Sequence, residues 1–268
     1  MAVANLLVVI IDLVLRQIPV RYENQFLFMY SFPVCNLHAV LLYSATDCSV
    51  WFTVAFTFDR FVAICCQKLK TKYCTDKIAA VVLGTVTALF CLKNTAWYFM
   101  LTAGYRFQNV PWFCAVRNAA VDSKIWATVE ILHYILTPLL AFVLVLLLNA
   151  FTAVHISLVR RARERSHGQS SDSELEAQRK SIILLFVISG NFILLWAVFM
   201  VYSVWNRVFW MGYESIYLPR FVMELGFMLQ LLSCCTQTCI YAVTQNKFRE
   251  ELKDVVICPF TAIVNLVH

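Results

Sequence analysis

An adjacent acid and base, Asp59-Arg60, close a long apolar and aromatic run that begins near Cys48. An ionised pair at the end of a membrane-length helix is costly unless it has a partner or a function. The alternative is an arginine whose long side chain reaches the lipid headgroups. Because Lys68, Lys70 and Lys72 follow closely, both interpretations place this pair at the boundary between lipid and cytoplasm.

A second group of polar and aromatic residues falls in the outer parts of three apolar runs, where a buried site could hold a ligand. Carboxylates there could meet an amino group of a ligand, and aromatic rings could form the walls of its pocket. The alternative is a polar network between helices, and the sequence leaves both interpretations open. The residues with these properties are His38, Tyr43, Thr46, Asp47, Glu130, His133, Tyr134, Trp196 and Phe199.

Catalytic motifs are absent from the sequence. It has no Gly-rich phosphate loop, no zinc-spaced set of Cys and His residues and no nucleophile elbow. We therefore expect no enzymatic activity, no cofactor and no bound metal.

The composition is that of an integral membrane protein. Hydrophobic residues make up 61% of the chain, charged residues 14%, and the mean hydropathy is +0.71. Soluble domains have roughly 45–50% apolar and about 25% charged residues. A net charge of +6 could indicate nucleic-acid binding, but the basic residues lie in short loops between apolar runs. That distribution is a topology signal, so we expect no nucleic-acid partner.

Six apolar runs predict an all-α bundle of six membrane helices over residues 1–244. A cytoplasmic tail over 245–268 follows, with an amphipathic helix that could lie along the interface. The loops between the runs include residues 20–33, a basic segment after the second run and a polar, aromatic segment from Thr102 to Lys124. The predicted spans are Met1 to about Pro19, Cys35 to Cys65, Ile78 to Leu101, Ile125 to Ile156, Arg179 to Trp205 and Leu218 to Val243.

The charges of the loops between the apolar runs also predict how the chain is oriented across the membrane. Most lysines and arginines of the loops fall on one side of the six spans, which should be cytoplasmic, and both termini then lie on that side. Three polar residues interrupt the first span, Asn5, Asp12 and Arg16, and we expect them to face other helices rather than lipid.

Cysteine positions agree with this topology. Of the eleven cysteines, Cys35 and Cys114 fall on the outer side, where disulfides form and persist. We predict a bridge between them; the alternative is two free thiols. Cys258, just after the amphipathic stretch, is a candidate acylation site.

The order of these features resembles that of the rhodopsin-like (class A) G-protein-coupled receptors. Asp59-Arg60-Phe61 follows Cys35 by 24 residues on the same helix, and a second outer cysteine comes next. A Pro-containing helix, a Trp-containing helix and a last helix that ends in Tyr241 complete the set. Within the class, the stretches around Asp59 and Cys239 to Gln245 are most similar to fish relatives of the orphan G-protein-coupled receptor 139 group.

The resemblance implies a role for the charged pair. Asp59-Arg60-Phe61 matches the family's Asp-Arg-Tyr, whose arginine is held by the neighbouring aspartate at rest and meets the G protein when the inner face opens.

The resemblance implies further roles along the chain. Trp196 matches the aromatic switch at the floor of the pocket, Pro138 the kink of the fifth helix, and Tyr241 the tyrosine of Asn-Pro-x-x-Tyr. Cys35 and Cys114 match the outer disulfide. The alternatives are a packed core tryptophan for Trp196 and an interfacial tyrosine for Tyr241.

Several positions depart from the family pattern. Asn5 stands where the family has a sodium-binding aspartate, Gln237-Thr238 replaces Asn-Pro, Val198 replaces a proline, and Leu146 replaces a tyrosine that meets the arginine. The family has seven helices, and the run from Met1 matches its second. We therefore expect a chain without the first helix.

The function that follows from the resemblance is that of a receptor in the cell membrane. It would transmit the signal of an extracellular ligand, either a small aromatic amino acid-like molecule or a peptide, to a heterotrimeric G protein. Leu42 occupies the place of the amine receptors' aspartate, which argues against a monoamine. Membrane lipid and a second receptor chain are further expected partners. The alternatives are a truncated, non-signalling isoform and a polytopic transporter, although no internal repeat favours the latter.

Overall fold

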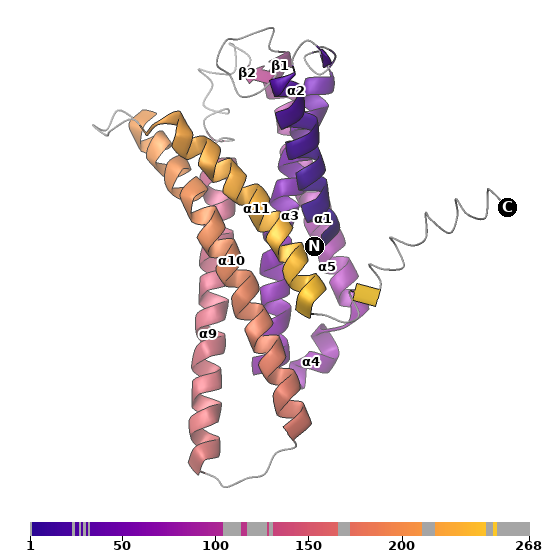
Figure 1. The fold of residues 1–268 in the computed structure, drawn as a ribbon. Coiled ribbons are helices and arrows are strands. Elements are labelled where there is room, and N and C mark those ends of the chain that lie inside the picture. Colours follow the sequence, from indigo (N-terminus) through magenta and orange to yellow (C-terminus); the bar gives the residue numbers. More distant parts are fainter. Residues whose placement is uncertain are drawn as a thin grey trace, which may run out of the picture.

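The computed structural model describes residues 2–22, 25–26, 28, 31, 33–103, 114–116, 128, 131–165, 172–210, 218–244 and 249–250. In this part of the chain, helical runs pass alternately up and down one bundle (Figure 1). The predicted all-α membrane bundle is confirmed. Glu130, Cys258, most of the predicted amphipathic tail and the side chains of Cys114 and Tyr241 lie outside the described set.

Among the residues that the structure describes, five helical stretches are long and apolar enough to cross a membrane. They are Val34–Cys65, Asp76–Met100, Leu132–Val159, Ile182–Trp205 and Phe221–Thr244. The remaining predicted span forms three consecutive helical segments, α1 (Ala2–Val8), η1 (Val9–Gln17) and α2 (Ile18–Arg21). From Ala2 to Arg21 this run measures about 30 Å, close to the thickness of the hydrocarbon core.

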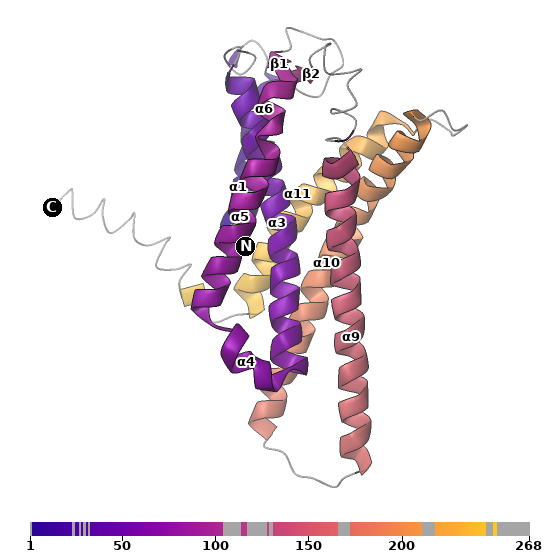
Figure 2. The same ribbon diagram turned by 180° about the vertical axis from the view of Figure 1, so that it is seen from behind.

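Helix α3 (Val34–Cys65) is the central element, as Figures 1 and 2 show. It packs against the first helical run (Ala2–Arg21), the helical stretch Asp76–Met100, α9 (Thr137–Arg165) and α10 (Asp172–Trp210). Its buried face carries hydroxyl groups, and Thr53 and Thr57 satisfy theirs by donating to backbone carbonyls four residues earlier, at 3.0 and 2.8 Å. This local bonding allows polar residues inside an apolar bundle.

Two π-helical segments lie in runs that the sequence predicts as plain helices. One is η1, and the other is η4 (Leu132–Leu136), which directly precedes α9. Pro138 has no backbone N–H, and its ring crowds the preceding turn. The hydroxyl of Thr137 donates to the carbonyl of Leu132 at 2.6 Å and ties the widened turn. The disruption predicted at Pro138 therefore takes the form of a π segment on its N-terminal side.

The inner connection after α3 is helical, which corrects the prediction of a basic loop. Helix α4 (Gln67–Tyr73) carries Lys68, Lys70 and Lys72. Helix α5 (Asp76–Asn94) then returns through the bundle, and its first turn is capped by Thr75, whose side chain accepts from the N–H of Ile78 at 3.4 Å.

At the outer end, part of the segment predicted as a loop forms a β-hairpin. After α6 (Ala96–Met100), strand β1 (Leu101–Ala103) pairs antiparallel with β2 (Cys114–Val116), with Ala103 opposite Cys114. The side-chain amide of Asn36 fixes this hairpin to α3 by donating to the carbonyls of Tyr98 at 2.6 Å and Leu101 at 2.8 Å. Backbone pairing fixed by a distant helix was not visible in the local sequence.

Helices α10 and α11 (Arg220–Thr244) make the most extensive contact between described helices. Gly226 allows this approach, because a Cβ at that position would lie 3.1 Å from the Cα of Phe199. Polar contacts add to the apolar packing, since the hydroxyl of Thr236 donates to the side-chain oxygen of Asn191 at 2.9 Å.

Candidate functional site: a pocket in the outer half of the bundle

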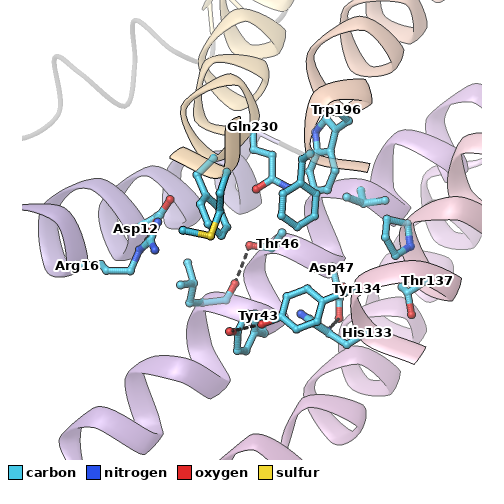
Figure 3. Close-up of a pocket in the computed structure, with 16 residues that line it drawn as sticks. Asp12, Arg16, Tyr43, Thr46, Asp47, His133, Tyr134, Thr137, Trp196 and Gln230 are labelled. Carbon is cyan, nitrogen blue, oxygen red and sulfur yellow. Dashed lines mark hydrogen bonds and ion pairs between the residues drawn. The ribbon is translucent and has the colours of Figure 1, made fainter. Parts of the chain in front are cut away.

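A pocket opens between η1, α3, the η4–α9 junction, α10 and α11 (Figure 3). It contains about 870 Å³ of space not filled by protein atoms, including the part open to solvent. The described members of the predicted ligand group line it, as does Pro138, with the exception of His38, whose Nε2 lies 3.0 Å from the carbonyl oxygen of Ile11. The lining residues are Asp12, Arg16, Leu42, Tyr43, Thr46, Asp47, Val50, His133, Tyr134, Thr137, Pro138, Trp196, Phe199, Met223, Phe227 and Gln230.

One wall of the pocket is a cluster of aromatic rings. The hydroxyls of Tyr43 and Tyr134 lie 2.8 Å apart and join α3 to η4. The ring of Tyr43 lies 4.4 Å from that of Trp97 and 4.5 Å from that of His133, centroid to centroid. These separations are within the range of favourable aromatic contacts, so the rings form a packed wall rather than isolated side chains.

The α10 side of the pocket is built from a stack around Trp196. This residue is 4% exposed, and its ring lies 5.5 Å from Phe192 and 6.1 Å from Phe199. Phe199 in turn lies 5.5 Å from Phe227 of α11. Trp196 is thus both a pocket-lining residue and a packed core residue, and its role as a switch stays a prediction.

Asp47 forms an ion pair with Lys93, a residue for which the sequence predicts no role in the site. Its Oδ2 lies 2.7 Å from the ammonium of Lys93 and accepts from the side-chain amide of Asn94 at 2.7 Å. The ring nitrogen Nδ1 of His133 is 3.8 Å from the same oxygen. Asp47 therefore does not present an uncompensated charge to a ligand amino group, because a buried carboxylate requires a partner within the protein.

Asp12 and Arg16 form a second buried ion pair on the opposite side of the pocket, as Figure 3 shows. The Nε of Arg16 donates to Oδ1 of Asp12, one turn earlier in η1. The guanidinium carbon also lies 5.0 Å above the ring of Phe227. The expectation that these residues face other helices is confirmed, since their exposed fractions are 6% and 4%.

Below the pocket, a polar junction joins the first run, α3 and α11. The side-chain oxygen of Asn5 accepts from the hydroxyl of Ser49 at 2.6 Å, and its amide donates to Oε1 of Gln237 at 3.1 Å. The amide also reaches the carbonyl of Cys234 at 3.4 Å. Here Asn5 and Gln237, two of the departures from the family pattern, bond to each other with neutral groups.

The Asp59-Arg60 pair lies near the inner end of α3. Arg60 donates to Oδ2 of Asp59 through Nε at 3.0 Å and Nη2 at 2.5 Å. About a third of each side chain is exposed, and the guanidinium carbon is 5.6 Å from the ring of Phe56. Leu146 of α9 is 46% exposed and points out of the bundle.

The sulfur of Cys35 is buried in a disulfide at the outer end of α3. The backbone of Cys114 lies in β2, which contacts α3. Because the side chain of Cys114 lies outside the described set, the Cys35–Cys114 pairing stays a prediction.

Together, the antiparallel bundle, its outer pocket and the charged pair at its inner end define a polytopic membrane protein with a receptor-like layout. The model of the 7 transmembrane receptor (rhodopsin family) matches residues 1–241. The chain belongs to this family of receptors and is a multi-pass protein of the cell membrane. It is also similar to cysteinyl leukotriene receptor 1 of Sus scrofa, with 22% identity over 262 residues that cover 94% of this chain and 71% of the relative.

Proposed function

We propose that this protein is a ligand-activated receptor that signals to a heterotrimeric G protein. The observation that carries the proposal is the layout of α3. Its outer half lines the pocket at Thr46, and its inner half ends with the Asp59-Arg60 pair. The distance between these positions along the helix is about 21 Å, so one rigid element links the ligand pocket to the cytoplasmic face.

The roles of individual residues belong to this proposal. Asp59 holds Arg60 at rest, and Phe61 follows in the same turn. Movement at Trp196 and at the π segment before Pro138 shifts α9 and α10, and this frees Arg60 for the G protein. Tyr241 acts at the inner end of α11.

Other proposed features concern assembly and the membrane. Cys35 bonds to Cys114, Cys258 carries a lipid, and a second receptor chain binds in the membrane. Residues 1–244 form the receptor bundle and 245–268 its cytoplasmic tail. We also propose that the protein has no catalytic activity, in line with its membership of a receptor family.

The ligand is proposed to be a small aromatic amino acid-like molecule or a peptide. The aromatic wall of Tyr43, Tyr134 and His133 and the stack of Trp196 and Phe199 suit a ring-bearing ligand. The narrower likeness to the orphan receptor 139 group rests on the stretches around Asp59 and Cys239 alone.

The proposal is tested by expressing the chain in cells with a sensor of G-protein dissociation and applying a panel of aromatic amino acids and peptides. We expect at least one member to give a response that Arg60→Ala abolishes. Arg161→Ala is the matched control, because Arg161 is an exposed arginine of α9. A response that survives Arg60→Ala at equal surface expression would contradict the role of Arg60.

A second candidate is a receptor that binds ligand without signalling. It is favoured by the outward position of Leu146 and by the Asn5–Gln237 bond, both at positions that work with the arginine in the family. Ligand binding to the purified protein without any G-protein response in cells would support this candidate over the first.

A further inference from the structure

Arg16 differs from Lys93, the cation beside the pocket, in its unused hydrogen-bonding capacity. A guanidinium carries five N–H donors. One of them, on Nε, is used by Asp12. Within the ranges that the structure describes, Arg16 makes no other hydrogen bond, and Asp12 accepts at one oxygen alone. Four donors and one carboxylate oxygen therefore remain on a pair that is more than nine-tenths buried and lines the pocket.

Asp47 and Lys93 are more fully engaged. Lys93 donates to Asp47 at 2.7 Å and to the hydroxyl of Thr137 at 3.2 Å, and Asn94 also donates to the same carboxylate oxygen. Lys93 is not among the lining residues. Among the residues that the structure describes, the cation that can meet a ligand in the pocket is thus Arg16.

The charges around the pocket also restrict the ligand. In the described part of the chain, two carboxylates, Asp12 and Asp47, face two cations, Arg16 and Lys93, so these four side chains add no net charge. A ligand with one uncompensated charge would bring that charge into an apolar bundle, which is costly. A zwitterion adds both signs together and leaves the balance unchanged.

We propose that the Asp12–Arg16 pair is the anchoring site for the zwitterionic head of an α-amino acid-type ligand. The carboxylate of the ligand binds the terminal nitrogens of Arg16, and its ammonium group binds the free oxygen of Asp12. The planar guanidinium suits a two-point contact with a carboxylate. Phe227, which stacks under Arg16 at 5.0 Å, begins the apolar path from the head toward Phe199 and Trp196. This inference rests on the proposed receptor function and specifies its ligand.

The test measures binding to the purified, detergent-solubilised protein by the shift in its melting temperature, which does not require a G protein. Three probes share one aromatic ring: L-phenylalanine, L-phenylalaninamide without the carboxylate, and 3-phenylpropionate without the ammonium group. We expect L-phenylalanine to bind at least about tenfold more tightly than either analogue, since each lost charged hydrogen bond weakens binding by about that factor or more.

Two variants locate the effect. Arg16→Gln should weaken the binding of L-phenylalanine at least about tenfold and leave that of L-phenylalaninamide little changed. Because Arg16→Gln leaves Asp12 buried without a cation, the double variant Asp12→Asn/Arg16→Gln keeps a neutral amide pair and guards against misfolding. Arg161→Gln on the exposed part of α9 is the control and should bind as the unchanged protein does.

Equal binding of the amide would overturn the role of Arg16, and equal binding of phenylpropionate would overturn that of Asp12. No melting shift with L-phenylalanine up to about 10 mM would exclude the proposed ligand class, since weaker binding is beyond ordinary receptor affinities. The predicted shifts without G-protein activation in cells would uphold the anchoring site and contradict the proposed signalling function.

Discussion

Three described cation–carboxylate pairs of this receptor fall into two regions with opposite surroundings. Asp12–Arg16 and Asp47–Lys93 line or adjoin the outer pocket, where the side chains of the carboxylates are 8% and 7% exposed. Asp59–Arg60 lies at the inner end of α3 with about a third of each side chain exposed. Ion pairs of the same kind are therefore expected to affect the stability of the fold differently in the two regions. Breaking a buried pair leaves a stranded charge, whereas an exposed pair can separate at little cost.

This contrast suits the two ends of a receptor. A pocket needs fixed groups that hold their geometry before the ligand arrives, and buried ion pairs are hard to rearrange. An inner face that must change its partner needs an ion pair whose loss is nearly neutral for stability. The following predictions test the contrast in order of expected effect.

The largest effect is expected from Lys93→Ala. It removes the ammonium partner of Asp47 and leaves a buried carboxylate with the hydrogen bond from Asn94 and His133 at 3.8 Å. The free energy of unfolding should fall by about 3–5 kcal/mol, as measured for broken buried pairs. Thermal unfolding in detergent and surface expression measure the change.

The matched control for that loss is Asp47→Asn/Lys93→Met, which removes both charges. It should recover most of the lost stability, because the cost comes from the unpaired charge. If Lys93→Ala alone melts like the unchanged protein, the Asp47–Lys93 pair contributes nothing and the contrast between the two regions is wrong.

A smaller effect is expected from Asn5→Ala in the neutral polar junction. The substitution leaves the Ser49 hydroxyl and the Gln237 amide without their partner. Stability should fall by about 1–3 kcal/mol, the usual cost of orphaned buried polar groups. Asn191→Ala serves as the comparison, since Asn191 is only partly buried and bonds at the edge of the α10–α11 contact. An equal loss of stability in both variants would contradict the larger contribution predicted for the Asn5 junction.

The smallest effect on stability is expected from Asp59→Asn. The pair is part-exposed, and exposed ion pairs contribute about 0–1 kcal/mol. Basal G-protein signalling should rise at the same time, because Arg60 loses the charge that holds it at rest. Melting temperature and the unstimulated sensor signal are measured on the same preparation. A large drop in stability, or unchanged basal signalling, would show that this pair is structural.

The sequence predicted the helices well and the polar contacts between them poorly. The apolar runs placed α3 within one residue of its observed start and at its observed end, because span length and hydropathy are local properties. The burial of Asn5, Asp12 and Arg16 was also predicted, since lipid tolerates none of them. The Asp47–Lys93 pair was missed because its residues lie on different helices, and only packing brings them together.

The hairpin and the π segments were missed for related reasons. The strands β1 and β2 are three residues long and lie beside α3, where the side-chain amide of Asn36 donates to the carbonyl of Leu101, the first residue of β1. The π segment η4 depends on the Thr137 hydroxyl bonding five residues back, which hydropathy does not register. In the pocket, Tyr43, Thr46, His133 and Tyr134 were found from residue type and helix position, whereas Gln230 and Phe227 on α11 were not.

The two described π segments, η1 and η4, affect where related receptors can gain or lose single residues. Each widened turn accommodates extra backbone in a helix, as a π-bulge accommodates one inserted residue. Removing one residue within η1 would return a widened turn to ordinary α-helix, so the flanking segments would keep their facing while the side chains inside the segment shift by one position. Alignments of related receptors should therefore gain or lose single residues inside Val9–Gln17 and Leu132–Leu136, while the flanking helices keep their length. Such gaps would change which side chains enter the pocket without altering the bundle.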